Sequence, residues 1–180
     1  LGVLNGTIFE VVIIIMQPSL VLSAFFLKLT DSTFIAALPA ALMHLGGLWP
    51  QLIVAHIAEG MEYKKPIYVW AGIARTVTLA AMAVVTYEMV GVETSALVLF
   101  FAAVYFVYSS ANGAGGIGFM DMVAKTIPAT RRGRFMGLRG FYGGLMGLAT
   151  GFYVRYMLGE TGPAFPLNYA LLFFTATFFL

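Results

Sequence analysis

The sequence predicts an all-α membrane protein with six transmembrane helices, and two observations carry this prediction. Hydrophobic residues make up 61% of the chain and charged residues only 10%, whereas a soluble domain has about 25% charged residues. The apolar residues are also gathered in long runs that do not alternate with polar residues, which favours helices over a membrane β-barrel.

The six expected helices follow one another with short polar connections. They cover roughly residues 1–27, 34–58, 66–90, 96–126, 133–158 and 165–180. A helix that crosses a bilayer needs about 20 residues, and the first five runs reach that length. The chain begins inside an apolar run and the sixth run reaches Leu180 without a closing charge. We therefore expect residues 1–180 to form one membrane domain of a longer protein, with a complete small six-helix protein as the alternative.

Lysine and arginine predict the orientation of these helices. The second and fourth connections and the helix ends beside them carry seven such residues: Lys64, Lys65, Lys125, Arg131, Arg132, Arg134 and Arg139. The other three connections have only Lys28 and Arg155 nearby. Because cytoplasmic connections are enriched in lysine and arginine, we expect the N-terminus and both basic connections in the cytoplasm. The protein would then be a multi-pass protein of the plasma membrane, the inner membrane of a bacterium.

Several classes of function are excluded at this stage. The chain has no cysteine, so it has neither disulfides nor thiolate metal sites. It contains no G-x-S-x-G, H-E-x-x-H or phosphate-loop motif, so we expect no enzymatic activity, no cofactor and no metal. The basic cluster is short and lies beside apolar runs, which argues against nucleic acid as a partner. A small molecule and the lipid bilayer are the expected partners.

Polar side chains inside the apolar runs are the candidates for a binding site. Glu10 and Gln17 lie near one stripe of the first helix, because seven residues make close to two turns. Tyr105, Tyr108 and Asn112 share a face of the fourth helix. Packing is the alternative role for the two tyrosines, and Gln17 could instead satisfy the backbone freed by the proline that follows it.

Two intramembrane charges need partners in the apolar environment. Arg75 lies about 13 Å into the third helix, where it is expected to pair with an acid or to extend to the inner surface. Glu10 must pair, bind a cation or take up a proton, because an isolated carboxylate is costly inside a membrane. Its possible roles are proton coupling or solute binding, a salt bridge to Arg75, or polar packing.

Charged residues at the inner helix ends form a candidate cytoplasmic gate. The members are Glu59, Lys64, Lys65, Asp121, Arg132, Arg134 and Arg139. The hypothesis is that Asp121 and Glu59 pair with Arg132, Arg134 or Arg139 in the outward-facing state, and that such pairs hold one conformation a few kcal/mol below another. Alternatively, the arginines only anchor the topology.

Glycines on the fifth helix repeat every four residues, at Gly140 and Gly144 and at Gly143, Gly147 and Gly151. Such stripes let helices approach closely, either as a moving interface or as static packing. Residues 112–116, N-G-A-G-G, predict a softened or tightly packed segment in the fourth helix.

Two of the connections resemble those of a known family. Arg132-Gly133-Arg134 with Gly137, preceded by Pro128, resembles the loop between the fourth and fifth helices of major facilitator superfamily transporters. In the second connection, Glu59 and the run Lys64-Lys65-Pro66 match the acidic and basic ends of the family's G-x-x-x-D-R-x-G-R-K-P signature. The glycine and arginine in the middle of that signature are missing.

The resemblance covers essentially the whole chain and implies the N-terminal half of such a transporter, a bundle of three plus three helices. It implies that the first and fourth helices line a central cavity, that a C-terminal six-helix half completes the protein, and that a small solute moves by alternating access. Symport or antiport with protons is one form of this function. A membrane-integral assembly or scaffold protein on the same fold, which moves no solute, is the alternative.

Overall fold

A computed structural model describes residues 2–180, and within that range the chain forms helices and no strand. Nine elements follow one another: α1 (Gly2–Ile15), the π-helix η1 (Pro18–Leu22), α2 (Ser23–Thr30), α3 (Thr33–Ala36), α4 (Leu38–Glu59), α5 (Lys65–Glu88), α6 (Thr94–Thr126), α7 (Ala129–Leu158) and α8 (Leu167–Phe179). The expected helical architecture is confirmed, whereas the boundaries differ in the first and second helices.

Proline breaks the first expected helix. Pro18 has no backbone N–H to donate, so α1 ends at Ile15 and Gln17 adopts an extended conformation (φ −62°, ψ 115°). The chain then makes one π-helical turn, stabilised by a hydrogen bond of 2.7 Å from the Ser23 hydroxyl to the Pro18 carbonyl. A single helix over residues 1–27 was therefore wrong in detail, and the segment is a broken helix.

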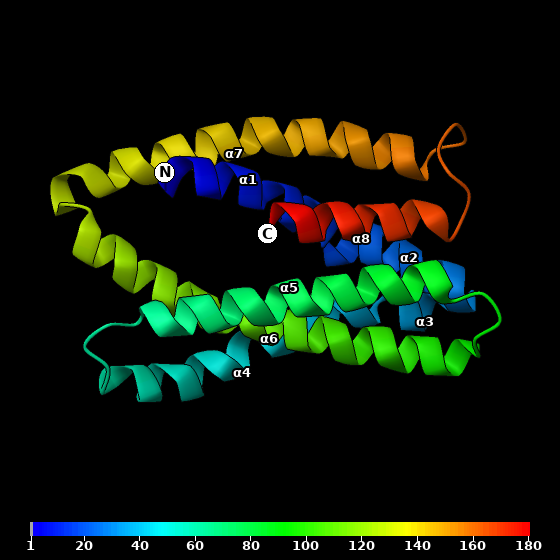
Figure 1. The fold of residues 1–180 in the computed structure, drawn as a ribbon, viewed down its shortest axis with the longest axis horizontal. Coiled ribbons are helices and arrows are strands. Elements are labelled where there is room, and N and C mark those ends of the chain that lie inside the picture. Colours follow the sequence, from blue (N-terminus) through cyan, green and yellow to red (C-terminus); the bar gives the residue numbers. More distant parts are fainter. Residues whose placement is uncertain (1) are drawn as a thin grey trace.

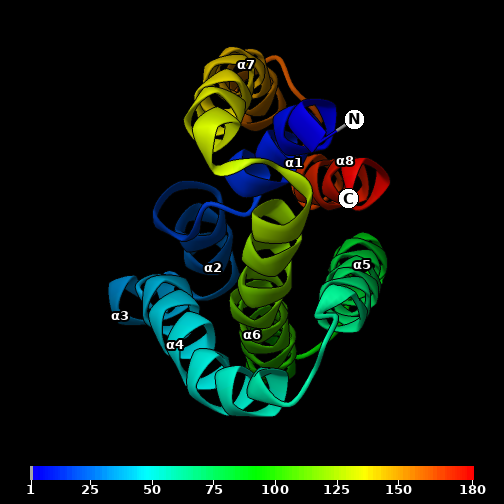
Figure 2. The ribbon, with the colours of Figure 1, turned by 90° about the vertical axis from the view of Figure 1, so that its left-hand side faces the viewer.

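The helices form two groups that meet along part of their length. Viewed end-on, α1, α7 and α8 lie together above, and α4, α5 and α6 lie below (Figure 2). In the lower group α6 packs against both α4 and α5, and in the upper group α1 packs against α7 and α8. Contacts of α8 with α5 and of α2 with α6 join the two groups.

One end of the molecule carries most of the basic residues. The N-terminus and the connections α4–α5 and α6–α7 lie at this end, on the left of Figure 1, and the other connections lie at the opposite end. We call it the basic end, defined by Lys64, Lys65, Lys125, Arg131, Arg132 and Arg134. The up-and-down path thus brings the two basic connections together, as the charge distribution predicts.

In the described part of the chain, residues 2–180, four segments are long and apolar enough to cross a membrane: Gly2–Thr30, Thr33–Glu59, Lys65–Glu88 and Thr94–Thr126. The expectation of six such segments is met only in part. The 30-residue α7 carries five arginines and many glycines, which lower its mean hydropathy. The 13-residue α8 is about 20 Å long by helical rise, which is less than the roughly 30 Å of a bilayer's hydrocarbon core.

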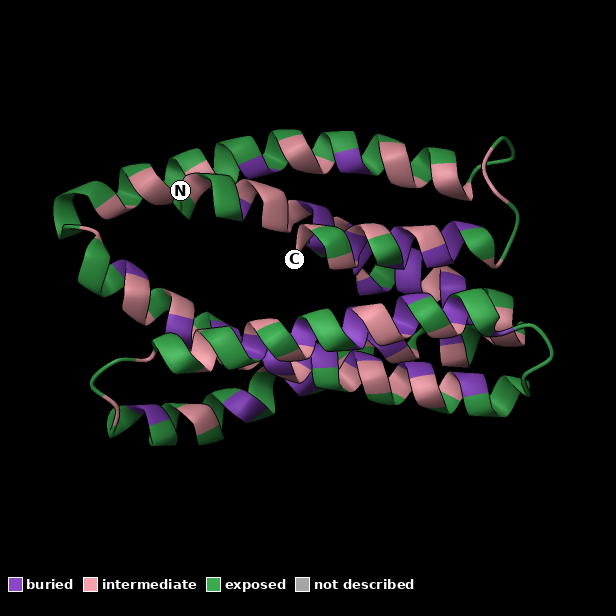
Figure 3. Cartoon of the chain, in the orientation of Figure 1, coloured by how far each residue is buried: buried purple, intermediate pink, exposed green. Residues whose placement is uncertain are grey.

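Buried residues lie mainly where the two helix groups meet (Figure 3). Phe25 of α2 lies at the centre of an aromatic cluster, with its ring 4.7 Å from Phe101 of α6 and 5.5 Å from Phe173 of α8 between centroids. Many large apolar side chains point outward instead, among them Leu52 at 78% and Phe178 at 84% exposure. In water such a surface would be unfavourable, so this distribution suits a protein surrounded by lipid.

Glycines let α6 pack tightly on both neighbours. A Cβ at Gly113 would lie 2.6 Å from the Gly47 carbonyl oxygen of α4, and a Cβ at Gly118 would lie 2.9 Å from the Tyr68 backbone nitrogen of α5. Gly116, between them, has open space around its α-carbon. Of the two alternatives for residues 112–116, the tightly packed helix is the one observed.

Candidate functional site

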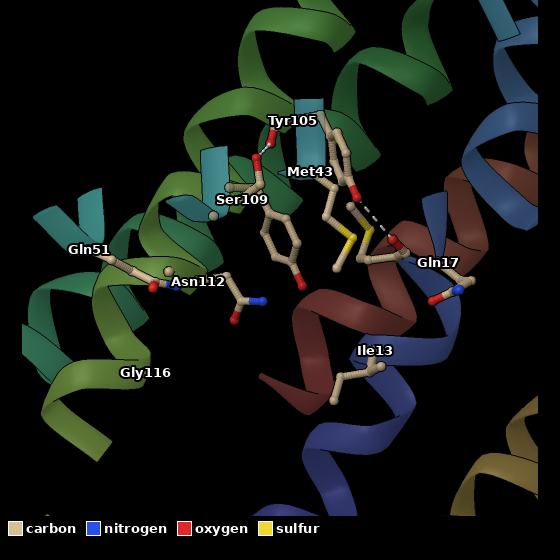
Figure 4. A pocket seen from close by; sticks show the side chains of 12 residues that line it. Ile13, Gln17, Met43, Gln51, Tyr105, Ser109, Asn112 and Gly116 are labelled. Carbon is tan, nitrogen blue, oxygen red and sulfur yellow. Dashed lines mark hydrogen bonds between the residues drawn. The ribbon is translucent and has the colours of Figure 1, made fainter. Parts of the chain in front are cut away.

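A cavity of about 280 Å³ lies between α1, α4 and α6. Its wall combines amide, hydroxyl and phenol groups with apolar side chains and glycines: Ile13, Met16, Gln17, Met43, Gly47, Gln51, Tyr105, Tyr108, Ser109, Asn112, Gly113 and Gly116. Four of the five expected binding residues, all except Glu10, therefore line one cavity (Figure 4).

Tyr105 fixes the cavity wall by joining α6 to the end of α1. Its hydroxyl donates a hydrogen bond of 3.3 Å to the Met16 carbonyl, which is free because the helix breaks at the next residue. The side chain is 1% exposed and stacks on Tyr108 with ring centroids 5.8 Å apart. The packing role thus describes Tyr105, while Tyr108 completes the wall beside it.

Gln17 is positioned by the proline break. Its backbone carbonyl accepts from the amides of Leu20 and Leu22, and its side-chain amide donates to the Ser19 hydroxyl at 3.3 Å. The amide side chain therefore takes part in the turn and also lines the cavity.

Asn112 connects this cavity to the buried Arg75. Arg75 of α5 is 6% exposed, and its Nη1 donates to the Asn112 Oδ1 at 3.3 Å. Its Nε donates to the carbonyl of Ala71, one turn earlier in the helix, at 3.3 Å. Within residues 2–180, no carboxylate lies within 4.0 Å of Arg75. The expected acidic partner is thus replaced by an amide.

A second cavity of about 100 Å³ lies next to the first, and Asn112 and Gly116 line both. Its other lining residues are Phe9, Tyr68, Arg75, Gly115, Phe119 and Arg139. Arg139 was expected in the cytoplasmic gate, but its guanidinium lies 4.2 Å from the centroid of the Phe119 ring, at this second cavity. Helix spacing along α7 could not have predicted this position, because it depends on how α7 crosses α1 and α6.

Glu10 faces away from both cavities. Its carboxylate lies against Gly143 of α7, and its side-chain carbons lie against Gly147, where a Cβ would come within 3.5 Å. It lines an open groove that also contains Arg155. Gly143 and Gly147 of one glycine stripe therefore pack against α1, whereas Gly151 and the other stripe, Gly140 and Gly144, have open space.

Asp121 forms the charged cluster of the basic end, with partners other than those expected. Its carboxylate lies 3.0 Å from the Lys125 ammonium and 3.9 Å from that of Lys64. Lys125 also donates to the carbonyl of Glu62. These contacts fasten the α4–α5 connection to α6.

The expected partners of Asp121 and Glu59 lie elsewhere. Arg132 donates to the carbonyls of Ile127 at 2.9 Å and Ala124 at 2.6 Å, so it caps the C-terminus of α6. Glu59 lies 3.9 Å from the His56 ring on the exposed surface of α4. Arg134 and Lys65 are exposed, so the gate residues form no single network in this conformation.

Ser109 and Ser110 fasten α6 to α4 beside the cavity, a role that the sequence did not indicate. The Ser109 hydroxyl donates to the carbonyl of Tyr105 at 2.9 Å and lies 3.1 Å from that of Leu42 in α4. Trp49 donates through its ring nitrogen to the Ser110 hydroxyl at 2.9 Å. The two serines directly follow Tyr108 in the sequence, but their contact with α4 depends on how α4 and α6 cross and could not be predicted from helical spacing.

Comparison of the chain with protein-family models, curated proteins and solved structures finds no match in any of the three. The described part of the chain, residues 2–180, also has no group of three histidine or acidic residues that could hold a metal ion.

Proposed function

We propose that this chain is the N-terminal six-helix half of a secondary transporter of the major facilitator type, which moves a small solute across a membrane by alternating access. One observation carries the proposal. A cavity of about 280 Å³ with a partly polar wall lies among helices that are apolar enough to span a bilayer. A polar cavity at membrane depth is costly unless it is used.

The break at Pro18 supports the same function. Interrupted helices with unpaired backbone groups are typical of transporter binding sites at membrane depth. Here the broken segment between Ile15 and Pro18 forms part of the cavity wall through Met16 and Gln17. A scaffold protein needs neither a broken helix nor an internal polar space.

The arrangement of two helix groups also suits movement between two states. The upper and lower groups are joined mainly by α2 and α8, while α1 makes few contacts with α5 and α6. Few direct contacts between these helices would let the two groups move relative to each other at a small cost. We also propose that Glu10 takes part in proton coupling, on the sole ground that it is a carboxylate within an apolar helix.

Alternating access is tested by placing a cysteine in the cavity; residues 1–180 contain no cysteine, and any cysteine elsewhere in the full-length protein is first replaced by serine. Gly47→Cys is suitable because Gly47 lines the cavity and a side chain there meets no atom within 4 Å. In membrane vesicles, this cysteine should react with an impermeant thiol reagent added from either side. Thr130→Cys and Thr161→Cys, at opposite ends of the molecule, should each react from one side only and so report the orientation of the vesicles.

Reaction of Gly47→Cys from one side only, with both controls behaving as expected, would contradict alternating access. Uptake of radiolabelled solutes by vesicles that contain the full-length protein then identifies the solute. A scaffold protein would show no uptake above that of vesicles without protein.

A further inference from the structure

We infer that the cavity between Arg75 and Arg139 binds the anionic group of the transported solute, a carboxylate or a phosphate. This inference rests on the proposed transport function and specifies the class of solute. We call this space the arginine cavity, lined by Phe9, Tyr68, Arg75, Asn112, Gly115, Gly116, Phe119 and Arg139.

The lining of the arginine cavity is positively charged. Arg75 and Arg139 both line the arginine cavity, and no acidic residue does. Within residues 2–180, neither guanidinium has a carboxylate within 4.0 Å. Charges in a membrane interior are normally paired, so two unpaired positive charges at one cavity leave a place for a negative charge.

The guanidinium groups of Arg75 and Arg139 have N–H donors that are not used in hydrogen bonds. The Nη1 of Arg139 is fully buried and has no hydrogen-bond partner. A guanidinium has five N–H donors, and Arg75 uses its Nε and Nη1. Since a buried donor without a partner is unfavourable, an acceptor in this cavity would stabilise both side chains.

Aromatic rings hold the two guanidinium groups in place. Arg75 lies 5.0 Å from the Phe9 ring centroid and 5.9 Å from that of Tyr68, and Arg139 lies 4.2 Å from that of Phe119. The Arg139 side chain occupies the space that a Cβ at Gly6 would fill. Fixed, planar guanidinium groups suit the two-pronged recognition of carboxylate and phosphate.

Glu10 of α1 does not serve as the internal acidic partner of Arg75 and Arg139. It contacts Gly143, one turn after Arg139, but it lines the separate groove with Arg155. Its carboxylate therefore does not occupy the arginine cavity in this conformation.

The linings of the two cavities together indicate the chemical class of the solute. Asn112 lies at their boundary, with its oxygen bound to Arg75 and its side chain also lining the larger cavity. An anionic group in the arginine cavity would place the rest of the molecule among Gln17, Gln51 and Tyr108. The expected solute is therefore a small organic anion with further hydrogen-bonding groups.

The test measures the charge preference of the site in the full-length protein. Gly116→Cys places a thiol where both cavities meet, with no atom within 4 Å of the new Cβ. Its reaction rates with an anionic and a cationic methanethiosulfonate of similar size are compared. We expect the anionic reagent to react faster, and the ratio of rates to fall at least about tenfold with Arg75→Gln or Arg139→Gln, as the loss of one nearby charge predicts.

Arg134→Gln is the matched control for Arg139→Gln. It removes one positive charge from an exposed position on α7, the helix that also carries Arg139. Arg75→Lys should keep most of the preference, since it retains the charge. If Arg75→Gln does not fold, Arg139→Gln still decides the question, because its side chain is only half-buried. Equal rates for the two reagents, or an equal fall with Arg134→Gln, would overturn the inference.

Protection of the cysteine identifies the source of the anion. Sodium succinate or sodium phosphate should slow the reaction relative to sodium chloride at equal ionic strength. Slowing only by phosphatidylglycerol would mean that the cavity holds a lipid headgroup, and slowing by none of the three would mean that it binds no anion. Either result would overturn the inference without affecting the test of alternating access at Gly47.

Discussion

Alanine at position 113 tests whether the close approach of α4 and α6 builds the cavity. A Cβ at Gly113 would lie 2.6 Å from the Gly47 carbonyl oxygen, whereas ordinary van der Waals contact begins at 3.4 Å. The α4 backbone would have to move by about 0.8 Å to accept one methyl group. A backbone carbonyl cannot rotate away as a side chain can, so the helices themselves must separate.

The cost of Gly113→Ala follows from this displacement. Overpacking of a tightly packed contact costs about 1–3 kcal/mol. For a protein of this size, each 1 kcal/mol lowers the melting temperature by about 2–4 °C. We therefore expect the apparent melting temperature of the purified protein in detergent to fall by about 2–12 °C. Intrinsic tryptophan fluorescence is a suitable signal, because Trp49 lies on α4 and donates to Ser110 of α6.

Gly116→Ala is the matched control, three residues further along the same helix. It adds the same methyl group where no atom lies within 4 Å, and alanine is the better helix former by up to about 1 kcal/mol. The control should melt at or slightly above the wild-type temperature. An unchanged melting temperature for Gly113→Ala, or an equal fall for both variants, would refute the reasoning from helix packing.

Three further predictions concern topology, the basic end and Glu10. On intact cells, cysteines at Thr94 and Thr161 should react with an impermeant thiol reagent and one at Thr130 should not; the reverse pattern would overturn the cytoplasmic placement of the N-terminus. Asp121→Asn removes the ion pairs of Asp121 with Lys64 and Lys125, so tryptic cleavage after Lys64 should become faster. Glu62→Gln is its control, because Glu62 contributes only its backbone carbonyl to Lys125, and equal cleavage of both variants would show that the ion pairs do not hold the connection. Glu10→Gln should abolish concentrative uptake if the carboxylate carries the coupling proton; a variant that still concentrates solute with the wild-type pH dependence would show that Glu10 serves packing against α7.

Much of the candidate site could be predicted from periodicity alone. Tyr105, Tyr108 and Asn112 fall on one face of a helix because of their spacing, and the structure indeed places all three at one cavity. The helical class follows from composition, since only helices satisfy the backbone of such long apolar runs. The break of the first helix could also have been expected at Pro18, although its exact form depends on the turn that Gln17 and Ser23 make.

The sequence by itself determined the helices, the ends at which the basic residues gather, and the face on which each polar side chain lies. Only the tertiary structure decided which faces meet. Glu10 and Arg75, both about midway along apolar runs, are separated because Glu10 faces α7 while Arg75 faces Asn112 of α6. Arg139 likewise lines the arginine cavity because Gly6 leaves room for it against α1. The physical reason is that helical spacing fixes directions around one axis, whereas the partner of a side chain depends on how two helices cross, and here glycines far apart in the sequence set those crossings.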